Sequence, residues 1–154
     1  MQVKQPKPIV RFSNADVKLK LPEKTKLKAF LIAIFAEEQV SLASLQYVFC
    51  SDEYLLNINR QFLNHDYYTD IITFPMQSSP DPVVGEIYIS ADRTADHAQT
   101  MNISPIEELL RVIFHGALHL CGYKDKTEKE KQVMRAKENE YLEKWSSFHV
   151  EHNP

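Results

Sequence analysis

Two histidines spaced four residues apart are the part of this sequence best suited to chemistry. His115 and His119 belong to the stretch FHGALHLCGYKDK, and on a helix this spacing places both imidazoles on one face. Neutral imidazole is a common zinc ligand. The zinc-peptidase pattern H-E-x-x-H has the same spacing, but Gly116 occupies the position of its glutamate. The pair therefore indicates a metal site that lacks the peptidase base.

Such a site needs a third ligand, and the residues after the second histidine offer one. Gly122 is typical of the position that ends a helix, so the chain can turn back toward the histidines. Asp125 follows six residues after His119, and this set leaves a coordination position for water, as catalytic zinc sites do. Taken by itself, Asp125 is more typical of an exposed turn residue before Thr127 than of a ligand. The remaining histidines are rival third ligands: His65, His97, His149 and His152.

Composition narrows the class of protein. The chain has 154 residues, of which 44% are apolar and 25% charged, enough to bury the core of one globular domain. Its formal net charge is −3, whereas proteins that grip long nucleic acids through their phosphates are usually basic. Contact with nucleic acid should therefore be local or aided by a partner. We expect a single domain over residues 1–154, with a flexible tail from about residue 147.

Cysteine usage and hydropathy bear on the cellular compartment. Cys50 and Cys121 have apolar neighbours and do not form a C-x-x-C motif, which favours buried free thiols over disulfides. No basic-then-apolar leader opens the sequence, and no apolar run is long enough to span a membrane. We therefore expect a soluble cytoplasmic protein with no membrane partner.

The histidine pair lies in a segment that the sequence marks as a central helix. Residues 109–121 are apolar on almost every side, which is typical of a helix in the core. Ser104 and Glu107 carry the signature of a capping box, with Pro105 at the first helical position. β-Branched runs at 69–76 and 83–90 predict a β-hairpin before this helix.

The remaining elements are predicted from similar signals. Strands are expected at residues 8–13 and 44–50. Helices are expected at 21–39, 52–63, 91–101 and 128–145, the last three capped by Ser51, Ser90 and Thr127. The predicted fold is α+β: a mixed sheet of about four strands, with helices packed around a buried central helix that carries the metal-binding histidines.

Three stretches of the sequence together resemble the YbeY family of bacterial endoribonucleases, the ribosomal RNA maturation factors. HGALHLCGYKD is similar to the family signature H-G-x-L-H-L-x-G-Y-D-H. DYYTDIITFP at residues 66–75 is similar to D-x-P-T-D-V-L-S-F-P, and GEIYIS at residues 85–90 is similar to G-D-I-x-I-S. The resemblance implies a metal-dependent endoribonuclease for single-stranded or ribosomal RNA. It also implies zinc as the cofactor and the ribosome or small-subunit proteins as partners.

The sequence departs from the family pattern at the third ligand. Where the signature ends in Asp-His, this chain has Lys124 and Asp125, so the alignment also selects Asp125. A carboxylate in place of imidazole adds negative charge beside the ion, which should weaken the Lewis acid and raise the pKa of bound water. Zinc stays the expected cofactor, although an oxygen ligand widens the tolerance for other divalent ions.

A second departure concerns an arginine that the family carries just after an aromatic residue. Here Leu63 follows Phe62, and Arg60 lies three residues before Leu63 on nearly the same helix face. We hypothesise that Arg60 supplies the displaced guanidinium for an RNA phosphate; the alternative is an exposed helix arginine. The candidate catalytic residues are Arg60, His115 and His119, and the candidate metal ligands are His115, His119 and Asp125.

Several residues around these motifs have two interpretations each. Thr69 and Asp70 match family positions and could line the substrate groove or orient a ligand, although Asp70 could also serve as a turn residue. Tyr67 and Tyr68 could stack on unpaired bases or pack at the rim of the core. Glu86 replaces an aspartate of the family pattern, and its role stays open.

Gly116 favours phosphodiester cleavage over peptide hydrolysis. It cannot move the proton that the peptidase glutamate moves, whereas phosphodiester cleavage can rely on the metal or on the 2′-hydroxyl of RNA. A glycine also lets substrate or a neighbouring strand approach the helix closely. The alternatives are a metal-dependent peptidase-like hydrolase and a non-catalytic ribosome-assembly factor with a structural metal.

Overall fold

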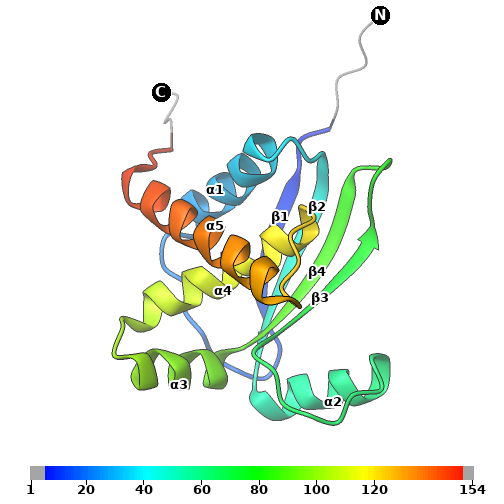
Figure 1. Cartoon of the computed structure of the whole chain (residues 1–154), viewed down its shortest axis with the longest axis vertical. Helices are drawn as coiled ribbons and strands as arrows, with labels where there is room; N and C mark the ends of the chain where they lie inside the picture. Colours follow the sequence, from blue (N-terminus) through cyan, green and yellow to red (C-terminus); the bar gives the residue numbers. More distant parts are fainter. Residues whose placement is uncertain (1–5, 151–154) are drawn as a thin grey trace, which may run out of the picture.

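Four strands and five helices follow one another between residues 6 and 150, the part of the chain that the computed structural model describes (Figure 1). The strands are β1 (Ile9–Asn14), β2 (Leu42–Cys50), β3 (Ile71–Gln77) and β4 (Val83–Ser90). The helices are α1 (Lys24–Glu37), α2 (Asp52–Phe62), α3 (Ala91–Met101), α4 (Pro105–Leu120) and α5 (Glu128–Ser147).

The strands form one mixed sheet in the order β1-β2-β4-β3. β1, β2 and β4 run parallel, and β3 pairs antiparallel with β4 as the predicted hairpin. α2 and α3 begin directly after β2 and β4, so both lie at the edge where these parallel strands end (Figure 1). The predicted α+β class with a four-stranded mixed sheet is therefore confirmed.

Local capping chemistry accounts for most helix starts. The side chains of Ser51, Ser90 and Thr127 each accept a hydrogen bond from the backbone N–H three residues later, as predicted. The capping box predicted at Ser104 is wrong, because the Ser104 side chain makes no capping hydrogen bond. Ser104 is nevertheless the N-cap residue and Pro105 begins α4, as predicted, since its ring presets the backbone angle of the first helical position.

α1 begins later than the sequence predicts. Glu23 adopts a left-handed conformation just before Lys24, so Leu21 and Pro22 belong to the turn rather than to the helix. The predicted inward face of this helix is buried throughout: Leu27, Phe30, Leu31, Ile34 and Phe35.

α4 packs closely against the sheet at Gly116. A Cβ atom at this position would lie 2.9 Å from Cδ1 of Ile87 in β4 and 3.0 Å from Cδ1 of Ile71 in β3. The glycine therefore lets neighbouring strands approach the helix, which is one of the two uses that the sequence offered for it. The apolar side chains of α4 fill the core around this contact: Leu109, Leu110, Val112, Ile113, Phe114, Ala117 and Leu118.

Aromatic side chains join α4 to α1 and α5. Phe30 of α1 has its ring centroid 5.1 Å from that of Phe114 and 5.3 Å from that of Trp145. Tyr141 of α5 also packs edge-on against Phe30. α5 is thereby held alongside α4, and its inward side chains can reach the histidine face of α4.

Three smaller predictions concern thiols, membranes and the tail. Cys50 and Cys121 are free; Cys50 is buried as predicted, whereas Cys121 is only partly buried, and burial raises the pKa of each thiol to about 12. Within residues 6–150, no helix combines the length and apolarity of a membrane span. The flexible tail stays a prediction: Phe148 packs edge-on against Phe30, and His152 lies outside the described residues.

Candidate metal centre

The structure brings together the two histidines of α4 and the aspartate that follows the helix. Oδ2 of Asp125 lies 3.2 Å from Nε2 of His115 and 3.3 Å from Nε2 of His119. The ligand atoms of the three residues lie within 4.8 Å of one another. Between residues 6 and 150 this is the one group of three histidine, cysteine or acidic side chains that converges in this way.

The turn after α4 brings Asp125 back to the histidines. Gly122 has a φ of 107°, a conformation that residues with a Cβ rarely adopt. The N–H of Tyr123 donates to the carbonyl of Leu118 at 3.1 Å, and the N–H of Gly122 donates to the carbonyl of His119 at 3.0 Å. These two bonds form the helix-ending Schellman motif, which reverses the chain. Its glycine was recognisable from the sequence.

Hydrogen bonds on the far side of each imidazole set its tautomer. Nδ1 of His119 lies 2.9 Å from the backbone carbonyl of Tyr123, and Nδ1 of His115 lies 2.6 Å from Oε2 of Glu138. A carbonyl and a carboxylate can only accept, so each Nδ1 carries the proton and donates it. The lone pairs of both Nε2 atoms are then free to face Asp125, which is the arrangement of histidines that bind metals.

The charges around His115 favour a cation at this point. Burial disfavours the charged imidazolium, but the hydrogen bond and charge of Glu138, with the charges of Asp125 and Asp70, outweigh it. The pKa of His115 is consequently raised above its ordinary value. The same negative surroundings favour a divalent metal ion, which competes with the proton for Nε2.

The donor set fits a divalent ion. Two imidazole nitrogens and one carboxylate oxygen match the three protein ligands of catalytic zinc sites, which keep a further position for water or substrate. The Asp125 side chain is 39% exposed, so the group opens to its surroundings rather than being sealed in the core. A structural zinc site would instead be closed by a fourth side chain.

The three candidate ligands line a cavity of about 1090 Å³. Thr69 and Asp70 line the same cavity, so the structure places both beside the site. His65 and His97, the rival ligands, also line it but are not part of the converging group. His149 is exposed beyond the end of α5, and His152 lies outside the described residues.

Two other candidates from the sequence lie outside the lining of this cavity. Arg60 pairs with the exposed Asp66, and their side chains are 2.5 Å apart between Nε and Oδ1. This ion pair raises the pKa of the Arg60 guanidinium. Glu86 lies on β4, where its carboxylate accepts a hydrogen bond from the Tyr88 hydroxyl at 3.5 Å.

Glu138 is the residue of the site that the sequence interpretation missed. It is 5% exposed, and besides His115 its carboxylate contacts Arg111 of α4 at 3.2 Å and Arg135 at 3.7 Å. With Met134 and Tyr141 it forms the buried face of α5. An acid at an inward helical position must find a partner, and that rule is the signal that could have identified it.

The cavity also contains polar atoms with unmet hydrogen-bonding capacity. Oε2 of Glu108 and Nε of Arg111 are buried without a partner among the described residues. Burial raises the pKa of Glu108, although the positive charge of Arg111 opposes this. Arg111, Arg135 and Lys131 supply positive charge to the cavity lining, so the lining contains both signs of charge.

Known proteins resemble this chain over most of its length. The family model described as Endoribonuclease YbeY matches residues 11–146. Endoribonuclease YbeY of Cytophaga hutchinsonii is 49% identical over 131 residues, which cover 85% of this chain and 92% of that protein. The Flavobacterium psychrophilum protein of the same name is 41% identical over 140 residues, covering 91% and 97%.

A solved structure agrees at the level of the fold. The solution structure of TM1509 from Thermotoga maritima superposes with a TM-score of 0.63 at 27% identity, covering 90% of this chain and 89% of that one. The matched family model spans the sheet except for the start of β1, α4 with its two histidines, the Asp125 turn and nearly all of α5. The chain therefore belongs to the YbeY endoribonuclease family.

Proposed function

We propose that this chain is a metal-dependent endoribonuclease that cleaves single-stranded RNA at the cavity containing His115, His119 and Asp125. The observation that carries the proposal is the convergence of these side chains, with both Nε2 atoms facing the carboxylate. Membership of the YbeY endoribonuclease family supports the same reaction class. Ribosomal RNA is the substrate that we propose on family grounds, with the ribosome or small-subunit proteins as partners.

The proposed cofactor is one zinc ion per chain held by His115, His119 and Asp125. The donor set supports zinc, and the carboxylate ligand also admits harder divalent ions. When bound, such an ion supplies a Lewis acid that offsets charge on phosphoryl oxygens and acidifies water.

The side chains around the ion orient the ligands and hold charge. Glu138 and the carbonyl of Tyr123 keep the protons of both imidazoles on Nδ1. We assign Thr69 and Asp70 to the substrate groove, because both line the cavity. A cation should bind the RNA phosphate, and Arg135 of the cavity lining is one candidate beside Arg60, the candidate from the sequence.

The position of Gly116 supports phosphodiester over peptide cleavage. In the zinc peptidases this position carries the glutamate that moves protons between water and the leaving amine. Here Gly116 faces β3 and β4 and does not line the cavity. Even a single Cβ atom at this position would crowd Ile87. No proton-moving glutamate can therefore stand there without displacing the sheet.

RNA cleavage by the purified protein, measured with and without a chelator, tests the proposal. The substrate is a labelled unpaired oligoribonucleotide, with the same sequence as a duplex for comparison. We expect cleavage of the unpaired RNA, its loss on chelation and its return when zinc is restored. Metal analysis of wild type should give one ion per chain, and Asp125→Ala should lose that ion together with cleavage.

Two outcomes would replace the proposal. Metal-loaded protein that leaves unpaired RNA intact but binds ribosomal particles would be an assembly factor with a structural metal. Chelator-sensitive cleavage of protein without cleavage of RNA would indicate a peptidase. An ion retained by Asp125→Ala but lost on substitution of His65 or His97 would reassign the third ligand.

A further inference from the structure

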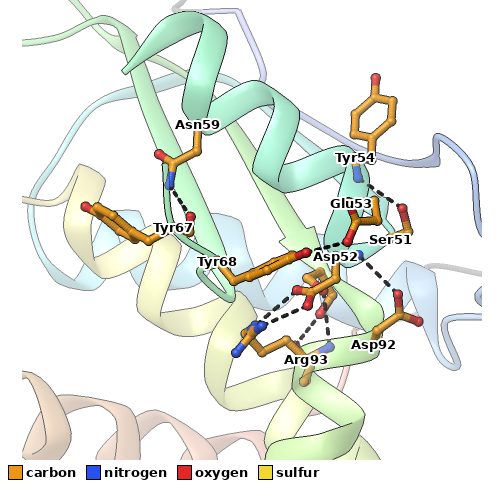
Figure 2. Close-up of polar contacts among 11 residues, drawn as sticks. Ser51, Asp52, Glu53, Tyr54, Asn59, Tyr67, Tyr68, Asp92 and Arg93 are labelled. Atoms are coloured by element: carbon orange, nitrogen blue, oxygen red, sulfur yellow. Dashed lines mark hydrogen bonds and ion pairs between the residues drawn. The ribbon is translucent and has the colours of Figure 1, made fainter. Parts of the chain in front are cut away.

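Two adjacent tyrosines in the loop between α2 and β3 have different surroundings (Figure 2). Tyr67 is 56% exposed and Tyr68 is 45% exposed, so neither is part of the core. Figure 2 shows the two rings pointing in opposite directions along the loop. The contacts of each ring decide which of them a ligand in the cavity can reach.

Tyr68 is occupied by contacts with α2 and α3. Its hydroxyl donates to Oε1 of Glu53 at 2.5 Å, and its ring faces the guanidinium of Arg93 at 5.2 Å (Figure 2). Arg93 is itself held by two hydrogen bonds to Asp52, at 3.0 and 2.8 Å. Tyr68 therefore fastens the loop to the start of both helices, and it does not line the metal cavity.

Tyr67 is fixed at its backbone while its ring stays exposed. The buried Asn59 donates its side-chain amide to the carbonyl of Tyr67 at 2.8 Å (Figure 2). The backbone carbonyl of Asn59 accepts a hydrogen bond from the N–H of His65 at 3.0 Å. The ring stacks on that of His65, with centroids 5.0 Å apart and planes 21° apart. The Tyr67 hydroxyl and Nδ1 of His65 share a hydrogen bond of 2.9 Å.

This stacked pair lines the same cavity as the candidate metal ligands. The pair is held in place before any ligand arrives, so little conformational entropy is lost when a flat molecule stacks on it. Unpaired nucleobases are the flat groups that proteins bind on exposed aromatic rings. Lys131 and Arg135 of the same lining match the charge of the adjoining phosphates.

We propose that Tyr67, supported by His65, is a stacking platform for one unpaired nucleobase of the RNA whose phosphodiester lies at the metal centre. This inference rests on the proposed endoribonuclease function and adds the part of the substrate that the ring recognises. Stacking is available only to a base that is out of a duplex, so the platform also favours single-stranded over paired RNA.

Cleavage kinetics of ring substitutions test the platform. The substrate is a labelled unpaired oligoribonucleotide, and kcat and KM are measured separately at one metal ion per chain. We expect Tyr67→Ala to raise KM about 10-fold or more, because a base–aromatic stack is lost. Tyr67→Phe keeps the ring and should stay within about twofold of wild type, whereas Tyr67→Leu should behave like alanine.

Tyr68→Ala is the matched control, since Tyr68 is a neighbouring exposed tyrosine of the same loop. Its KM should change less than about threefold, with circular dichroism and metal content as for wild type. An equal rise of KM in Tyr68→Ala would assign the effect to the folding of the loop and overturn the proposal. A loss in Tyr67→Phe as large as in Tyr67→Ala would also overturn it, because the ring would not be the cause.

Substrates that lack a single base provide a second test. Removing the stacked base should raise KM for wild type about as much as Tyr67→Ala does, and should cost nothing further in that variant. Full additivity at every position would overturn the platform while leaving the endoribonuclease function intact. Wild type that fails to cleave any unpaired RNA would overturn the proposed function itself.

Discussion

The imidazole of His115 shows how one residue of the site depends on another helix. Its Nδ1 donates to Glu138 of α5, and its Nε2 faces Asp125. The histidine pair is a local feature of α4, but the proton position that frees Nε2 is decided by a carboxylate 23 residues further along the chain. Glu138 is therefore a positioning residue in the proposed centre.

Glu138→Gln should weaken metal binding while leaving all three ligands in place. The amide still accepts from Nδ1 of His115, but it loses the charge that strengthens the hydrogen bond and attracts the ion. We expect zinc affinity to fall about 10- to 100-fold, as it does when partners of metal-bound histidines are changed. Competition with a chromophoric chelator measures this, and the exposed Glu143→Gln is the control. Equal affinity in both variants would contradict the role.

The phosphate-binding arginine can be identified by comparing two alanine variants. The hypothesis from the sequence predicts loss of cleavage in Arg60→Ala, whose side chain pairs with Asp66 outside the cavity lining. Because Arg135 lines the cavity and Arg60 does not, we expect the larger loss in Arg135→Ala. Removing a charged hydrogen bond should lower kcat/KM about 10- to 100-fold. Metal content should be unchanged in both. Full activity in Arg135→Ala with none in Arg60→Ala would favour the sequence hypothesis.

At the level of elements, the contact between α4 and the sheet fixes where the histidine face can point. The helix lies close to β3 and β4 at Gly116, where a Cβ atom would meet Ile87 and Ile71. His115 is the preceding residue, so it points to a different side of the helix and lines the cavity. Gly116 thus lies on the side of α4 that packs on the sheet, and the candidate ligands His115 and His119 lie on the side that lines the cavity.

Gly116→Glu restores the H-E-x-x-H pattern of the zinc peptidases but should not produce a peptidase. The new carboxylate would enter the packed contact with Ile87 without a polar partner, so we expect the free energy of unfolding to fall by about 3 kcal/mol or more. Gly116→Ala should cost less, because a gain of about 1 kcal/mol in helix propensity offsets part of the crowding. Urea denaturation measures both, and a wild-type midpoint for Gly116→Glu would contradict this packing.

At the level of the whole molecule, Glu38 ties α1 and α5 to the turn that delivers Asp125. It caps the end of α1 and accepts hydrogen bonds from the hydroxyls of Tyr123 and Tyr141 and from Lys137. Burial opposes its charge, but these hydrogen bonds and the charge of Lys137 lower the pKa of Glu38 below its ordinary value. Tyr123 is also the residue whose carbonyl holds His119.

This lowered pKa gives stability a defined pH dependence. A carboxylate with a depressed folded-state pKa stabilises the fold above its unfolded pKa of about 4.3, and loses that contribution as the pH falls through the folded value. Glu38→Gln should lower the free energy of unfolding at pH 7 by about 2 kcal/mol, since charged hydrogen bonds are weakened. Urea unfolding of both proteins from pH 7 to pH 3 measures this. The difference should shrink toward pH 3, and a constant difference would contradict it.

The predictable features of this protein are those encoded within a few neighbouring residues. The spacing of His115 and His119, the helix-ending Gly122 and the caps at Ser51, Ser90 and Thr127 depend on hydrogen bonds and side-chain directions inside one element or turn. The hairpin and the α+β class follow from periodicity for the same reason. The capping box at Ser104 is the exception, because the Ser104 side chain makes no capping hydrogen bond although the residue stands at the N-cap.

The sequence by itself thus determined most of the helices and strands and the spacing of the histidine pair, and it indicated Asp125 as the third ligand. The tertiary structure decided which distant side chains meet them: Glu138 behind His115, Arg135 rather than Arg60 in the cavity lining, and Tyr67 rather than Tyr68 facing the site. These choices depend on the strand order and on how α5 and the α2–β3 loop pack. Such contacts join residues far apart in the chain, and no local pattern of residue types encodes them.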